Sequence, residues 1–220
     1  MDFSLQSLPE GLPLICAALI VWALWSDWRR YDWGSLARGP VLNRLLGATV
    51  VLMLLWSMST HLNPGFALHF LGATATVLIF GRAPALAALA AASIAAWLLH
   101  GGELLAWPFN YALLGLMPAW FASLADAWLQ RRLPNHFFVF IFLNTCFVAA
   151  LSMLAIGVAA TALLAFRGEP LARLLDGYLP YFLMLGFGEA WLSGIVITLL
   201  VVYKPGWVAS FDDRRFLMNK

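Results

Sequence analysis

Residues 66–80 of the chain read Phe66-Ala67-Leu68-His69-Phe70-Leu71-Gly72-Ala73-Thr74-Ala75-Thr76-Val77-Leu78-Ile79-Phe80. The stretch has the apolar composition of a membrane-spanning helix, and His69 is its one ionisable residue. An imidazole in the hydrocarbon region of a bilayer costs free energy unless a partner satisfies it, which makes His69 a candidate functional residue. The sequence on either side indicates whether the chain lies in a membrane and what His69 binds there.

Composition places the chain among membrane proteins. Of its 220 residues, 63% are hydrophobic and only 11% are charged, whereas soluble domains carry about 25% charged residues. The charges also cluster between long apolar runs, as in a polytopic membrane protein. The net charge of +2 and the lack of a basic tract argue against a nucleic acid partner. No glycine-rich phosphate-binding loop is present for binding ATP.

Apolar segments that could span a membrane follow one another along the chain. The first and third are short for a hydrocarbon core of about 30 Å, which needs about 20 helical residues. Only Gly81-Arg82 separates the third from the fourth, so a six-span fold with these two as one broken unit is the main alternative. Trp25, Trp28 and Trp33 stand near a predicted span end, where aromatic residues anchor helices at the interface. The segments are Pro13–Trp25, Val41–Met58, Phe66–Phe80, Ala83–Leu99, Trp107–Leu129, Phe137–Phe166 and Leu179–Tyr203.

Positive charges favour seven spans with the N-terminus outside. In that topology, of the 13 Lys and Arg residues, only Arg167 and Arg173 lie in outer loops, and an excess of positive charge is typical of cytoplasmic loops. Merging the third and fourth segments would move Arg131 and Arg132 to the outside. The sequence therefore predicts an all-α fold, a polytopic membrane helical bundle of about seven transmembrane helices, N-out and C-in. We expect a single integral-membrane domain over residues 1–220, in the inner (plasma) membrane.

Two histidines can approach each other on the predicted outer side. His61 lies in the loop before His69, and Asn63-Pro64-Gly65 between them is a turn sequence that lets the chain reverse. Two imidazoles that face one cavity suit a late first-row cation such as Ni, Co, Cu or Zn. The alternative is that His61 is solvated at the interface and that His69 forms a hydrogen bond with a backbone carbonyl.

Further polar residues stand within or near the predicted spans. Asn110 opens the fifth span and is expected to face the bundle interior, where it forms an interhelical hydrogen bond or supports the candidate metal site. Glu189 lies in the seventh span and is expected to be protonated, to pair with a histidine or to face a partner protein. His100 shares an outer loop with Glu103 and is expected to be solvated or to line an outer entrance.

Short motifs follow one another along the chain. They are Leu8-Pro9-Glu10-Gly11, His69-Phe70-Leu71-Gly72, Gly101-Gly102 with Phe109-Asn110, and Glu189-Ala190 in a span that ends at Lys204-Pro205. In this order they resemble the Ile-Pro-Asp-Gly motif, the His-Leu-Leu-Gly motif, the Gly-Gly pair with a downstream Asn, and the last helix of one family. That family is the substrate-binding membrane component of cobalt/nickel energy-coupling-factor transporters, the CbiM/NikM type. The resemblance covers most of the chain.

The resemblance implies a metal site built from nitrogen ligands, of which one carries over. In the family, the N-terminal amine, the amide and ring of a His at the second position, and the His of the His-Leu-Leu-Gly motif hold the metal. Only the last is present, as His69. The second residue is Asp2, and Ser7 stands where the family's His precedes the first motif. Either His61 or Asp2 replaces the missing ligands, or the chain transports another substrate or keeps the fold without metal transport.

Two functions are consistent with the sequence and this resemblance. The first is the membrane permease and substrate-capture subunit of an ATP-driven energy-coupling-factor importer for Co²⁺ or Ni²⁺, with His69 as principal ligand and His61 and Asn110 in support. We expect no intrinsic cofactor, and we expect a transmembrane coupling subunit and separate ATPase subunits as partners. The second is a membrane accessory or assembly factor of a respiratory or metalloenzyme complex, which the missing N-terminal chelate favours. An enzyme is least supported, because no paired carboxylates or nucleophile–base pair is visible.

Overall fold

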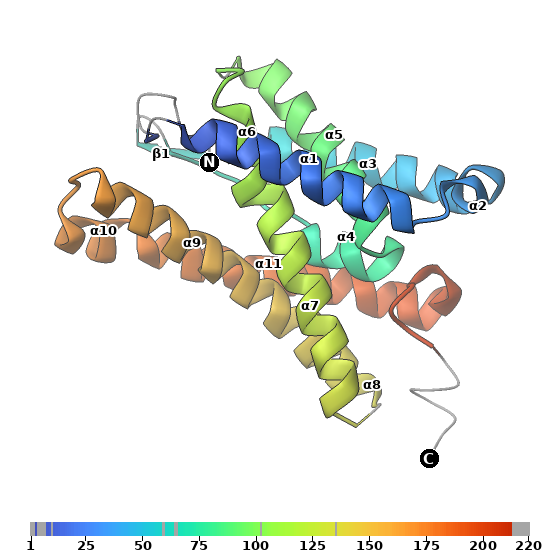
Figure 1. Cartoon of the computed structure of the whole chain (residues 1–220). Helices are drawn as coiled ribbons and strands as arrows, with labels where there is room; N and C mark the ends of the chain where they lie inside the picture. Colours follow the sequence, from blue (N-terminus) through green and yellow to red (C-terminus); the bar gives the residue numbers. More distant parts are fainter. Residues whose placement is uncertain are drawn as a thin grey trace. The chain divides into compact units, whose positions relative to one another are not determined.

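Two compact units make up the chain (Figure 1). The computed structural model describes residues 3, 8–9, 11–58, 60–63, 66–101, 103–134 and 136–212, without the side chains of Arg38 and of residues 60–63 and 66–68. The first unit comprises Met1–Leu71 and Ala83–Met117, and the second comprises Gly72–Arg82 and Pro118–Lys220. The single membrane domain expected from the sequence stays a prediction.

The first unit consists mainly of apolar helices. Its first helix has Pro13 in its first turn, where the missing N–H of proline would have no helical partner in any case. The next helix is short, and the side chain of Asp32 caps it by accepting hydrogen bonds from two backbone N–H groups. The helices are α1 (Leu12–Arg30), α2 (Trp33–Arg38), α3 (Val41–Ser57), α5 (Arg82–His100, its first residue in the second unit), α6 (Trp107–Tyr111) and the π-helix η2 (Ala112–Leu116).

A short β-hairpin follows α3 in the first unit. Strand β1 (Thr60–Asn63) pairs antiparallel with β2 (Phe66–Leu68), and His61 lies opposite Ala67. The register is irregular between His61 and Asn63. The antiparallel pairing confirms that the chain reverses between the strands, although residues 64 and 65 of the predicted turn lie outside the described residues.

Long helices with π-helical turns dominate the second unit. At the end of η3, the backbone N–H of Val148 donates a hydrogen bond to the carbonyl of Leu143 five residues earlier, which is the i to i−5 bond of a π turn. Gly157 of α9 lets Phe182 of α11 approach closely, because a Cβ at this glycine would lie 2.4 Å from the ring. The elements are α4 (Ala73–Phe80), α7 (Met117–Arg132, from Pro118 in this unit), α8 (Phe137–Val139), η3 (Phe140–Phe147), α9 (Val148–Phe166), α10 (Leu171–Gly177), α11 (Leu179–Tyr203) and the 3₁₀ turn η4 (Pro205–Trp207).

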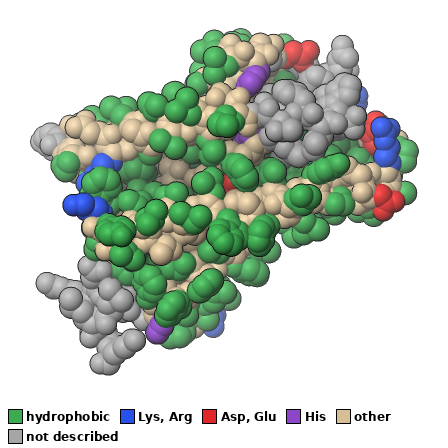
Figure 2. All heavy atoms as spheres, turned by 180° about the vertical axis from the view of Figure 1, so that it is seen from behind, with side chains coloured by type: hydrophobic (Ala, Val, Ile, Leu, Met, Phe, Trp, Pro, Cys, Tyr) green, Lys and Arg blue, Asp and Glu red, His purple; other side chains and the backbone are tan. Residues whose placement is uncertain are grey.

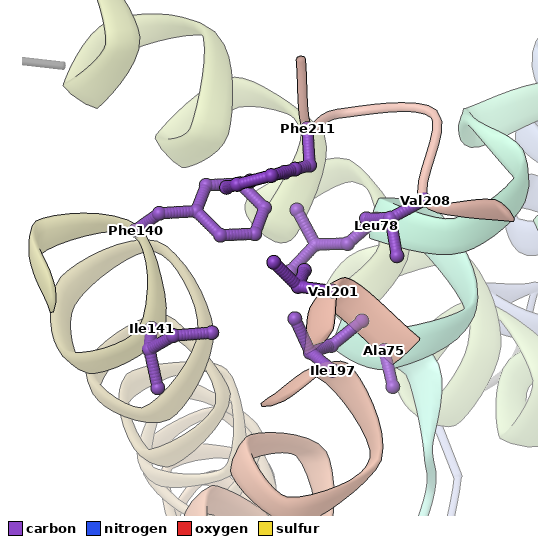
Figure 3. Close-up of a cluster of buried hydrophobic side chains, with 8 residues drawn as sticks. All are labelled: Ala75, Leu78, Phe140, Ile141, Ile197, Val201, Val208 and Phe211. Carbon is purple, nitrogen blue, oxygen red and sulfur yellow. The ribbon is translucent and has the colours of Figure 1, made fainter. Parts of the chain in front are cut away.

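A cluster of buried hydrophobic side chains joins α4, η3 and α11 of the second unit to the segment after η4 (Figure 3). We call residues 204–211 the C-terminal strap. The backbone N–H groups of Ala209 and Ser210 donate to the carbonyls of Ile79 and Leu78, each at 3.1 Å, so the strap pairs with the last turn of α4. The cluster consists of Ala75, Leu78, Phe140, Ile141, Ile197, Val201, Val208 and Phe211.

The predicted helical membrane protein is confirmed, with one span corrected. Among the described residues, five helical segments are long and apolar enough to cross a membrane. Figure 2 shows a face on which hydrophobic side chains predominate and charged ones are few. The N-out and C-in orientation stays a prediction. The long segments are α1, α5, α6 to α7, α8 to α9 and α10 to α11, and α3 is a shorter apolar helix.

The prediction of a continuous helix over Phe66–Phe80 is wrong. The segment instead contains β2, a non-helical stretch at residues 69–72 and the eight-residue helix α4. Eight helical residues extend about 12 Å, too little to cross a bilayer. The physical reason is Gly72, whose φ of 64° is left-handed and therefore interrupts a right-handed helix at a position that glycine tolerates without steric cost.

Candidate functional site

His69 lies on the non-helical backbone between β2 and α4 and is buried, with 8% of its surface exposed. Its Nδ1 is 3.1 Å from the carbonyl oxygen of Phe70. A carbonyl oxygen can only accept, so Nδ1 carries the hydrogen and the neutral ring has its lone pair on Nε2. Metal-bound imidazoles have this arrangement, with one nitrogen donating to a protein oxygen and the other ligating. The backbone hydrogen bond expected as the alternative is thus present, and it is compatible with metal binding.

Trp56, near the end of α3, holds the segment that contains His69. The two rings lie with their centroids 4.8 Å apart at an interplanar angle of 41°. The indole Nε1–H of Trp56 donates to the carbonyl of Leu71 at 3.0 Å, and only 3% of the tryptophan is exposed. All three residues belong to the first unit. The side chain of Trp56 therefore contacts the imidazole ring and fixes the backbone two residues beyond it.

The side chain of Asn110 binds the backbone of Phe3 near the N-terminus. Its Oδ1 accepts from the backbone N–H of Phe3 at 3.0 Å, and its Nδ2 donates to the Phe3 carbonyl at 3.2 Å. The Phe3 ring packs edge-on against Phe109, with centroids 5.4 Å apart. A carboxamide that binds both backbone groups of one residue fixes that residue as a strand partner would. Asn110 is half-buried, and its partner is the backbone of Phe3 instead of a neighbouring helix. Its part in a metal site stays a prediction.

The other predicted histidines are less informative. The backbone of His61 lies in β1, but its side chain falls outside the described residues, so its part in a metal site stays a prediction. His100 is exposed at the end of α5. Within the part of the chain that the structure describes, no three His, Cys, Asp or Glu side chains are grouped to hold a metal ion. The role of His69 as a metal ligand stays a prediction.

Glu189 has a backbone partner that the sequence had not indicated. This carboxylate of α11 is 2% exposed and accepts a hydrogen bond from the N–H of Gly72 at 2.6 Å, within the second unit. Gly72 precedes α4, whose first N–H groups lack helical acceptors. A carboxylate is favourable at this end of a helix, because the helix dipole is positive there. The short distance fits a charge-assisted hydrogen bond.

Sequence reasoning missed Trp56 and the role of Glu189 in holding Gly72. Trp56 lies in an apolar helix with several other tryptophans in the neighbouring segments, so nothing in its own type or spacing separates it from an interfacial anchor. For Glu189 the signal was visible, since a carboxylate in an apolar span requires a partner. Its partner was not visible, because it is a backbone group more than a hundred positions away in the sequence.

Comparison with known proteins agrees with this architecture. Residues 6–207 match the family described as the cobalt uptake substrate-specific transmembrane region, CbiM. A crystal structure of a truncated transition metal transporter superposes with a TM-score of 0.75 at 17% identity, covering 92% of this chain and 99% of that one. A second transition metal transporter structure gives a TM-score of 0.73 at 17% identity, covering 91% and 92%.

No curated protein matches the chain significantly. The two structural similarities, at this low identity, establish a shared fold. The family match extends from the N-terminal segment to η4 and therefore includes His69, Asn110 and Glu189. The chain belongs to the CbiM family of cobalt uptake substrate-specific transmembrane proteins.

Proposed function

We propose that this protein is the substrate-capture subunit of an ATP-driven importer for a divalent transition metal, with cobalt or nickel as cargo. Membership of the CbiM family over residues 6–207 carries the proposal. It favours import over the alternative of an assembly factor. ATP hydrolysis would take place on separate ATPase subunits, joined through a transmembrane coupling subunit in the inner membrane.

In this proposal His69 is the principal ligand and binds the metal through Nε2. Its Nδ1–H is engaged with the Phe70 carbonyl, which orients the ring and raises the basicity of the free nitrogen. Imidazole nitrogen suits late first-row divalent cations such as Co²⁺ and Ni²⁺. His61 remains the proposed second ligand.

Asn110 supports the site indirectly. It binds the backbone of Phe3 through both ends of its carboxamide, so it positions the N-terminal segment rather than coordinating the metal.

Metal binding by the purified protein tests the ligand assignment. We expect wild-type protein in detergent to bind Co²⁺ or Ni²⁺, and His69→Ala to lose most of the affinity, because an imidazole ligand is removed from a buried position. His136→Ala is the control, since it removes an imidazole of the second unit that accepts from the N–H of Phe138, and it should bind as wild type. Isothermal titration calorimetry with metal analysis of the dialysed protein gives both affinity and stoichiometry. Equal affinity in wild type and His69→Ala would contradict the assignment.

The partner assignment has its own experiment. We expect ATPase and coupling subunits encoded beside this protein to co-purify with it from membranes, and metal uptake by cells to require all of them. Co-purification with subunits of a respiratory or metalloenzyme complex instead would support the assembly-factor alternative.

A further inference from the structure

Aromatic and basic side chains gather where α1 ends and α2 begins in the first unit. Arg29 and Arg30 form the last turn of α1, a helix long and apolar enough to cross a membrane, and both are exposed. Trp25 and Trp28 are 61% and 57% exposed on the same helix. We call Trp25, Trp28, Arg29, Arg30 and Trp33 the Trp–Arg corner. Large exposed aromatic rings beside two cations at a helix end are typical of the membrane–water interface.

Contacts within the corner fix its rings in place. Trp28 and Trp33 are stacked with centroids 4.3 Å apart and an interplanar angle of 27°. The indole Nε1–H of Trp33 donates to the carbonyl of Trp28 at 3.1 Å, which closes the turn between α1 and α2. Tyr31 packs edge-on against Trp33, with centroids 5.0 Å apart. The aromatic side chains therefore form one ordered surface rather than separate exposed rings.

The charges of the corner are predominantly positive on the exposed side. The guanidinium of Arg29 lies 5.6 Å from the ring centroid of Trp25, a cation–π contact that presents the cation beside the ring. Asp27 is only 5% exposed. Asp32 is exposed, but its Oδ1 accepts from the N–H groups of Gly34 and Ser35 at 3.1 and 3.2 Å, so this oxygen is turned towards the start of α2.

The geometry points to the Trp–Arg corner as a binding site for the headgroup of an anionic phospholipid. A guanidinium group complements a phosphate in charge and in hydrogen-bonding geometry. Indole rings favour the headgroup level of the bilayer, where their apolar body and N–H group are both accommodated. Because α1 carries the corner at the end of an apolar helix, the arginines stand at the depth where lipid phosphates lie. This inference is independent of the metal that the protein carries.

Lipid binding to the full-length protein tests the proposal. The protein is purified in a neutral detergent and titrated with phosphatidylglycerol or with phosphatidylcholine, and lipid-bound fractions are measured by native mass spectrometry. We expect phosphatidylglycerol to bind more tightly, and R29Q/R30Q to weaken its binding about tenfold or more, since each arginine near an anionic headgroup contributes to the attraction. R29K/R30K keeps both charges but loses the planar guanidinium geometry, so we expect it to weaken binding less than R29Q/R30Q does.

The chain offers a matched control in a second Arg-Arg pair. Arg131 and Arg132 also form the last turn of a long helix, α7, and are also exposed, as is Trp128 on the same helix. Among the described residues, the stacked indole pair of the Trp–Arg corner has no counterpart beside them. We expect R131Q/R132Q to bind phosphatidylglycerol as wild type does. An equal loss in both double variants would overturn the proposal, because the attraction would then be a general effect of charge. The proposal would also be overturned if the protein bound both lipids equally or if R29Q/R30Q bound phosphatidylglycerol as wild type does. Displacement of phosphatidylglycerol by inorganic phosphate would overturn it as well.

Discussion

At the scale of single residues, the imidazole of His69 is fixed by contacts of two kinds. The Phe70 carbonyl engages Nδ1, and the indole of Trp56 covers the ring and donates to the Leu71 carbonyl. A side chain that is already held in one orientation loses little conformational freedom when it binds a ligand. The candidate ligand is therefore preorganised, with Trp56 as its positioning residue.

Trp56→Phe separates the two contributions of this tryptophan. Phenylalanine retains an aromatic face for His69 but removes the hydrogen bond to Leu71, so we expect metal affinity to fall by about 10- to 100-fold, as for other residues that orient a metal ligand. Cobalt or nickel titration calorimetry measures the change. Trp191→Phe, at a tryptophan that is 60% exposed, serves as the control. Wild-type affinity in Trp56→Phe would mean that the hydrogen bond does not position the site.

His69 was predictable from the sequence because an ionisable ring in an apolar run stands out by residue type alone. The partners of Trp56 and Asn110 could not be predicted in the same way. Both bind backbone groups, which every residue possesses, so no pair of residue types marks the contact. Asn110 binds Phe3 across 107 positions of sequence, and only the packed helices determine which backbone lies beside it.

At the scale of elements, α4 is a short buried helix held at both ends in the second unit. Glu189 accepts from the N–H of Gly72 at its start, and the C-terminal strap donates to the carbonyls of Leu78 and Ile79 at its end. Backbone groups at helix ends lack helical partners, and in the apolar interior of a membrane protein no water replaces them. These contacts explain how so short a helix is stable there.

Removing the Glu189 carboxylate should destabilise the second unit. We expect Glu189→Ala to lower the free energy of unfolding by about 1.5–3 kcal/mol, the range for a hydrogen bond to a charged group. Glu189→Gln keeps an acceptor oxygen and should lose less. Glu169→Ala removes an exposed carboxylate that contacts Arg173 at 3.9 Å and should change little. Thermal unfolding in detergent measures all three, and equal melting temperatures for Glu189→Ala and Glu169→Ala would contradict the role of Glu189.

The elements show where sequence patterns suffice and where they do not. Long apolar runs predicted the helices α1, α5 and α11 to within a few residues, because hydrophobic length dictates a membrane-spanning helix. The apolar run at Phe66–Phe80 predicted one long helix where the chain has β2 and α4, since hydropathy does not indicate the left-handed backbone of Gly72. The hairpin of β1 and β2 was also missed, apart from its turn, because short apolar runs do not distinguish a strand from a helix.

At the scale of the whole molecule, the distribution of Lys and Arg residues predicts the orientation in the membrane. The loops expected inside carry the large majority of the positive charges, and such asymmetry sets the topology of membrane proteins. In this orientation the loop with Glu103 faces outwards and the end of α7 faces the cytoplasm.

Cysteine labelling in cells tests this orientation. In a background with Cys16 and Cys146 replaced by Ser, we expect a membrane-impermeant maleimide to label Glu103→Cys in intact cells. Arg132→Cys should be labelled only after the membrane is permeabilised. Both wild-type residues are exposed, so access to the reagent depends on the side of the membrane. The reverse labelling pattern would show that the chain inserts with its N-terminus inside.

The contacts of α4 also constrain the order in which the chain can fold during synthesis. This helix leaves the ribosome well before its partners in α11 and the C-terminal strap are made. Contacts so distant in sequence form slowly, because a long loop must close first. Before these contacts form, α4 is too short to cross the bilayer as an independent span. The second unit therefore cannot assemble helix by helix in chain order, and its completion awaits the synthesis of α11 and the C-terminal strap.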